Sequence, residues 1–159
     1  MANRIFRSAR GNPRTLSHIP VAGALLPGTA VFVGATLAQA ATVSGGRLAL
    51  LGDRDFYGIA SAATEPLLTP YVSGETGIAY LLEPQDEVQW AMAAGTYTNG
   101  QELTVGAAGR LVAAVSTTTV TGNVTALGSI VVAHFDQAAA TLAAGALADV
   151  TISNFYIKA

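Results

Sequence analysis

The sequence predicts an all-β protein, a compact β-barrel or β-sandwich that carries an extended N-terminal arm and at most one short helix. Short runs of aliphatic and β-branched residues recur between glycine-containing turns, at the spacing of about 8–12 residues that is typical of barrels and sandwiches. Apolar residues also alternate with polar ones, as at Val88, Trp90 and Met92, which indicates strands with one buried face.

The expected strands follow from these runs in chain order. They are residues 29–33, 48–51, 56–60, 77–82, 87–93, 102–105, 110–115, 130–135 and 150–157. Asn99-Gly100 is the strongest hairpin signal, and residues 106–109 form a second tight connection. The alanine-rich stretch 137–145 does not show the pattern of a strand. It is either a short helical turn or a loop, and we favour the helical turn because alanine has the highest helix propensity.

The first 20 residues differ from the rest of the chain. They hold four of the eight basic residues and no acidic one, whereas residues 15–159 hold four basic and ten acidic residues, a net charge of −6. Gly11-Asn12-Pro13 and Pro20 interrupt regular structure. We therefore divide the chain into an extended basic arm, residues 1–20, and a β-barrel or β-sandwich domain, residues 21–159.

Apolar side chains are interleaved with the arginines of this arm. Exposed ion pairs contribute only about 0.2–1 kcal/mol each, so binding through the arm would also need apolar burial. The arm is therefore expected to contact a partner through both kinds of side chain. The expected contact residues are Arg4, Ile5, Phe6, Arg7, Arg10, Arg14, Leu16 and Ile19.

The composition favours a protein that attaches to other proteins. Charged residues make up 11% of the chain and hydrophobic residues 51%, against about 25% charged in typical domains. The longest apolar stretch, residues 19–41, is broken by prolines and glycines, so no membrane partner is expected. The net charge of −2 argues against nucleic acid as a partner.

Residues able to carry out catalysis are few. The chain has no cysteine, which excludes disulfides and thiolate metal sites. Asp86 and Glu87 are neighbours on an expected strand and would point to opposite faces, while His134 is a lone histidine in an apolar run. We therefore predict no catalytic, cofactor-binding or metal-binding residues, and no cofactor. Trp90, Met92 and Tyr97 are expected in the core or at a subunit interface.

Residues 75–157 resemble the capsid decoration proteins (cement or head-stabilising proteins) of tailed bacteriophages. The resemblance is carried by several segments, namely the strand-turn-strand 77–88, the loop 94–103, the turn Gly109-Arg110-Leu111, the stretch 128–136 and the final strand. The first turn reads Gln85-Asp86-Glu87-Val88 and lacks the glycine usual in the family.

This resemblance implies a β-barrel or β-sandwich, usually a homotrimer, at three-fold positions of a capsid, with N-terminal arms crossing neighbouring capsomers. The expected function is therefore structural. The protein would be made in the host cytoplasm, bind the major capsid protein and other copies of itself on the outer capsid surface of the virion, and have no enzymatic activity.

Two other functions stay open. The first is a phage tail, head-fibre or surface adhesion module, whose glycan- or receptor-binding face would draw on Tyr71, Tyr80, Trp90 and Tyr97. The second is a small β-barrel hydrolase using Asp86, Glu87 or His134, which would need a concave pocket with convergent polar groups.

Overall fold

The computed structural model describes residues 5–8, 13–54, 67–116, 118–120, 123–126 and 128–158. In these residues the predicted all-β class is confirmed, because every regular element is a strand apart from one 3-10 turn, η1 (Ala107–Gly109). The expected strand 56–60 lies outside the described residues. No helix in the described part of the chain is long and apolar enough to span a bilayer.

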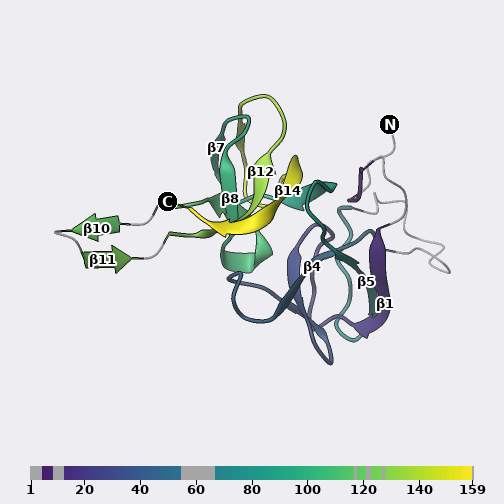
Figure 1. Ribbon diagram of the computed structural model, residues 1–159. Coiled ribbons are helices and arrows are strands. Elements are labelled where there is room, and N and C mark those ends of the chain that lie inside the picture. Colours follow the sequence, from purple (N-terminus) through teal and green to yellow (C-terminus); the bar gives the residue numbers. More distant parts are fainter. Residues whose placement is uncertain are drawn as a thin grey trace.

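Five strands from the first half of the chain form one antiparallel sheet, which we call the N-terminal sheet (Figure 1). Its strands, in spatial order, are β1 (Arg14–Pro20), β5 (Thr76–Leu81), β4 (Arg47–Leu51), β2 (Ala30–Val33) and β3 (Leu37–Gln39). A bridge between Val21, just after β1, and Leu37 of β3 joins the two edges of the sheet. The sheet therefore curls on itself.

A second antiparallel sheet, the C-terminal sheet, is a half-barrel. Its strands, in spatial order, are β6 (Glu87–Ala91), β14 (Leu147–Ile157), β12 (Ile130–Phe135), β8 (Glu102–Val105) and β9 (Leu111–Ala113). A bridge between Met92 and Leu111 joins its two edges at one end.

Alternation along the strands places two apolar clusters on opposite faces of the N-terminal sheet. In β4, Ala49 and Leu51 belong to a cluster with Leu25 and Tyr71, whereas Leu50 packs into the core of the C-terminal sheet. All of these side chains are at least 93% buried. Because successive strand residues point to opposite faces, this sheet separates the two clusters.

Two two-stranded sheets complete the described fold. The first pairs β7 (Gly95–Tyr97) with β13 (Ala140–Leu142), and the second pairs β10 (Thr118–Val120) with β11 (Asn123–Ala126). In Figure 1 the hairpin β10–β11 projects away from both sheets.

The helical turn expected at residues 137–145 is wrong, because β13 occupies this stretch. Ala140 is opposite Tyr97 and Leu142 is opposite Gly95, and the Thr96 and Thr141 hydroxyls lie 2.9 Å apart. The intrinsic preference of alanine for helix is small. Pairing with β7 outweighs that preference.

Candidate interaction surface

The segment 5–8, predicted as part of the arm, lies along β6. The Gln89 N–H donates to the Ile5 carbonyl at 2.6 Å, and the Arg7 N–H donates to the Glu87 carbonyl at 2.8 Å. The Ile5 side chain is fully buried in this chain's own core, and Phe6 lies 5.9 Å from Tyr80, centroid to centroid. Ile5 therefore has no surface left to offer to a partner.

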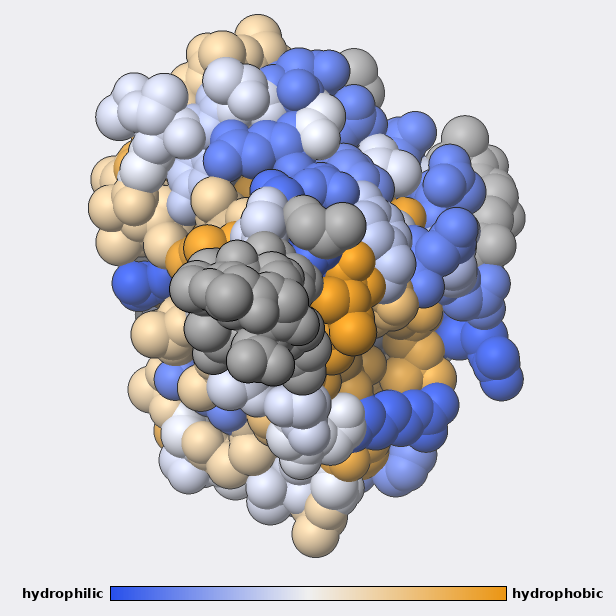
Figure 2. Space-filling view, turned by 60° about the vertical axis from the view of Figure 1, so that its left-hand side comes forward, coloured by the Kyte–Doolittle hydropathy of each residue, from blue (hydrophilic) through white to orange (hydrophobic). Residues whose placement is uncertain are grey.

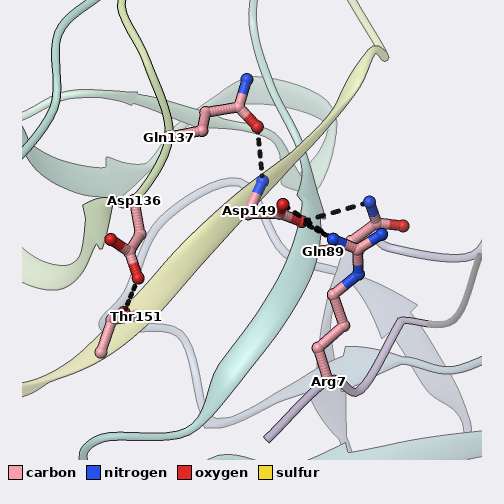
Figure 3. Close-up of polar contacts among 6 residues, drawn as sticks. All are labelled: Arg7, Gln89, Asp136, Gln137, Asp149 and Thr151. Carbon is pink, nitrogen blue, oxygen red and sulfur yellow. Dashed lines mark hydrogen bonds and ion pairs between the residues drawn. The ribbon is translucent and has the colours of Figure 1, made fainter. Parts of the chain in front are cut away.

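Arg7 forms an ion pair inside the chain (Figure 3). Its Nη1 donates to both carboxylate oxygens of Asp149 on β14, each at 2.7 Å. Gln89 of β6 also donates to this carboxylate at 3.2 Å, and the Asp149 N–H donates to the Gln137 side chain at 3.1 Å. Nearby, Thr151 donates to Asp136 at 2.7 Å. Arg7 thus holds the N-terminal segment against the C-terminal sheet.

The rest of the predicted arm divides in two. Residues 14–20 form β1, in which Ile19 is buried, Leu16 packs against the same cluster and Arg14 is exposed. Arg4 and Arg10 lie outside the described residues. The apolar anchors Ile5, Leu16 and Ile19 therefore serve this chain's own fold.

Trp90, Met92 and Tyr97 lie in the core of the C-terminal sheet, with exposed fractions of 0–3%. The Trp90 indole N–H donates to the Gly109 carbonyl at 3.1 Å, and the Tyr97 hydroxyl donates to the Ala93 carbonyl at 3.0 Å. Of the two placements expected for these residues, the structure shows the core. They present no surface to a second copy.

The aromatic residues named for a glycan-binding face do not form an exposed cluster. Tyr71, Trp90 and Tyr97 are buried, and Tyr80 is half-buried against Phe6. Burial raises the pKa of Tyr71 above its ordinary value. These four residues therefore do not support an adhesion face.

Of the residues named for a hydrolase, Asp86 has a structural role, whereas Glu87 and His134 lie on either side of Thr151 in the C-terminal sheet. Asp86 is 1% exposed, and its carboxylate accepts the Glu83 N–H at 3.0 Å, which closes the turn before β6. Glu87 is exposed at the start of β6, and His134 lies on β12 beside Tyr156. Within the described ranges, no group of three His, Cys, Asp or Glu residues is placed to hold a metal ion.

A polar network crosses the C-terminal sheet and fixes the end of β14. The Tyr156 hydroxyl donates to one carboxylate oxygen of Glu102 at 2.5 Å, and Lys158 pairs with the other at 3.1 Å. His134 Nε2 lies 3.0 Å from the same hydroxyl. The hydrogen bond to Glu102 raises the pKa of Tyr156 to about 12, and it lowers the pKa of Glu102. Sequence spacing gives no signal for this network, because its members come from three strands.

A cleft of about 410 Å³ lies between the two sheets. Its lining includes Leu26, Leu68, Gln89, Arg110 and Leu147. The side-chain oxygen of Gln89 is buried there and has no hydrogen-bond partner within the described structure. Among the described lining residues, Arg110 is the one with a titratable side chain.

The exposed apolar residues at the end of β14 and β9 form the best candidate surface for binding another protein. Val115 is 70% exposed, Phe155 39% and Ile157 55%. Hydrogen bonds from Ser129 N–H to the Val115 carbonyl and from Lys158 N–H to the Ser129 carbonyl place Ser129 between the segment of Val115 and the end of β14. We call Val115, Phe155 and Ile157 the apolar strip.

The apolar strip lies at the base of the hairpin β10–β11, since Val115 precedes β10 and residues 128–130 follow β11. Figure 2 turns the hairpin side of the molecule forward, and apolar surface is exposed there beside polar surface. Sequence reasoning placed 110–115 and 150–157 in strands but did not identify their ends as an exposed surface.

Comparison with known proteins adds no assignment to this surface. No protein-family model matches the chain, and no curated protein is significantly similar to it.

Proposed function

We propose that this chain is a structural virion protein that binds the outer surface of a phage capsid and stabilises it by bridging neighbouring capsomers. The observation that carries the proposal is the exposed apolar strip on a body that has few charged residues. Exposed apolar surface of this kind marks protein interaction sites. The resemblance of residues 75–157 to decoration proteins supplies the class of partner.

The docking surface proposed here is the apolar strip, in place of the arm expected from the sequence. Burying apolar area contributes about 25 cal/mol per Å², so three side chains give a modest affinity per copy. A capsid offers the same site many times, and bivalent or higher attachment raises the overall affinity through effective concentration. A weak site per copy is therefore sufficient where one complex attaches through the strips of several linked copies.

Co-sedimentation with mature heads of the encoding phage, stripped of this protein, tests the proposal. The informative variant is Val115→Ser combined with Ile157→Ser. The matched control is Val72→Ser, because Val72 is also a highly exposed valine, at 62%, but lies outside the strip. Arg14→Ala tests the arm without disturbing β1. Deleting residues 1–20 would remove β1 and buried Ile5, and so would test folding instead.

We expect saturable binding of the unaltered protein and of Val72→Ser, and weaker binding of the strip variant. Equal binding by all three would refute the strip as the docking surface. Absence of binding to heads by the unaltered protein would overturn the capsid function and favour the tail, fibre or adhesion alternative.

A further inference from the structure

The hairpin β10–β11 has no sheet to join within the described chain. Its two strands pair only with each other, through Thr118–Ala126, Thr119–Val124 and Val120–Asn123, and it projects from the body (Figure 1). An isolated two-stranded hairpin is marginally stable in water. Both of its outer edges also present unpaired backbone groups, which are templates for pairing with another strand.

The sequence of this hairpin lacks the usual protection of an open edge. No Asp, Glu, Lys or Arg occurs anywhere from Leu111 to Phe135, and the region contains no proline. Natural edge strands carry charges, prolines or bulges that prevent pairing. Here the one such feature is a register shift between Thr118 and Thr119.

The other sheet edges in the described fold are joined to one another by bridges or are anchored by packing against the core. The bridges Val21–Leu37 and Met92–Leu111 join the edges of the two large sheets. The two-stranded sheet β7–β13 is anchored by Tyr97, which is 3% exposed and packs against Phe135 in the core. The hairpin β10–β11 is therefore the element whose edges most need a partner.

We propose that hairpin β10–β11 pairs edge to edge with the same hairpin of other copies of this chain. A second copy fits because the hairpin is neutral: identical hairpins meet without like-charge repulsion, and no charged side chain is present to select an acidic or basic partner. Placing β11 of one copy beside β10 of the next keeps all neighbours antiparallel when the hairpins point the same way.

In this head-to-tail arrangement, both outer edges of each hairpin are paired with a strand of a neighbouring copy. A two-fold pair leaves one edge of each hairpin open, whereas a head-to-tail contact uses both edges and forms a ring when the rotation between copies closes. Such a ring would gather the apolar strips of several copies at its base, because Val115 and Ser129 flank the hairpin. The inference does not depend on capsid binding, since self-pairing occurs in the purified protein.

Sedimentation velocity of the purified full chain, without phage heads, tests the proposal. The first variant is Thr119→Lys with Val124→Lys, a cross-strand pair of the hairpin. Its matched control is Thr96→Lys with Thr141→Lys, the cross-strand pair of β7–β13. A second variant replaces residues 117–127 with a short glycine-serine linker, and tryptophan fluorescence of buried Trp90 confirms that its body is folded.

We expect an oligomer of three or more copies for the unaltered protein and for the control. Juxtaposed lysines should raise the dissociation constant by about tenfold or more, and the linker variant should be a folded monomer. A monomeric unaltered protein overturns the proposal, and so does a folded linker variant that still assembles. A dimer overturns head-to-tail pairing.

Discussion

The Nη1 atom of Arg7 lies 2.7 Å from both carboxylate oxygens of Asp149, although 142 positions separate the two residues in the chain. The contact joins the N-terminal segment to β14 across β6 (Figure 3). Because Ile5 is buried beside it, the first described residues are part of the folded body.

Ile5→Ala should destabilise the protein far more than Arg7→Ala. Truncating a fully buried isoleucine costs about 2–5 kcal/mol, whereas the Arg7–Asp149 pair is about one-third exposed and is worth roughly 0.2–1 kcal/mol. Urea unfolding followed by far-UV circular dichroism gives both values. A larger loss for Arg7→Ala would mean that the ion pair, and not burial, holds the segment.

Gly109→Ala should cost much more than Gly100→Ala. Both glycines have positive φ, +66° and +77°, but an added Cβ at Gly109 would lie 2.5 Å from Thr29 Cγ2 and 2.6 Å from the Ala30 oxygen. At Gly100 it meets nothing within 4 Å. The backbone strain is about 1–2 kcal/mol at either position, and overpacking adds about 1–3 kcal/mol at Gly109. Thermal unfolding of both variants measures the difference, and equal losses would contradict the close contact.

Trp90→Phe should lower the free energy of unfolding by about 2–4 kcal/mol. The substitution removes buried area and also the donor that lies 3.1 Å from the Gly109 carbonyl, and an unsatisfied buried polar group costs about 1–3 kcal/mol. Tyr97→Phe is the comparison, since it removes one hydroxyl bonded to the Ala93 carbonyl and should cost about 1 kcal/mol. Denaturation monitored by circular dichroism measures the free energy of unfolding of both variants. A decrease for Trp90→Phe no larger than that for Tyr97→Phe would argue against the buried indole contact.

Tyr156→Phe should reduce the loss of stability at alkaline pH. The pKa of Tyr156 is raised from 10.0 to about 12, chiefly by its hydrogen bond to Glu102. A raised pKa contributes stability that is fully present below pH 10 and is lost as the pH climbs through 12. Unfolding midpoints between pH 9 and 12.5 should therefore fall less steeply with pH in the variant than in the unaltered protein. The difference should correspond to the titration of one tyrosine hydroxyl.

Tyr71 and Tyr97 also have raised pKa values through burial. Both remain in the variant, so the difference between the two proteins isolates Tyr156. The same substitution should raise the lowered pKa of Glu102, whose first cause is this hydrogen bond. A carboxyl NMR titration measures that pKa, and an unchanged value would show that the hydrogen bond does not form in solution.

Much of the β structure follows from local sequence. The runs at 102–105 and 130–135 became β8 and β12 with the expected bounds, and Asn99-Gly100 lies at the turn between β7 and β8. Apolar alternation specifies these elements because it sets which face of a strand is buried.

Other elements carry no such local signal. The stretches that became β1 and β13 read as an arm and a helical turn, because prolines and alanines dominate their local preferences. Each became a strand by pairing with a segment distant in sequence, β5 for β1 and β7 for β13. The hairpin β10–β11 was likewise not expected, although its threonines and valines favour strands.

The sequence by itself determined the all-β class, most strand positions and the low charge, since these depend on the spacing and type of neighbouring residues. The tertiary structure alone decided that Ile5, Arg7 and Ile19 stabilise this chain's own fold, and that Val115 and Ile157 remain exposed. The reason is physical: burial depends on which distant segments pack together, and residues as far apart as Arg7 and Asp149 meet only after both sheets have formed.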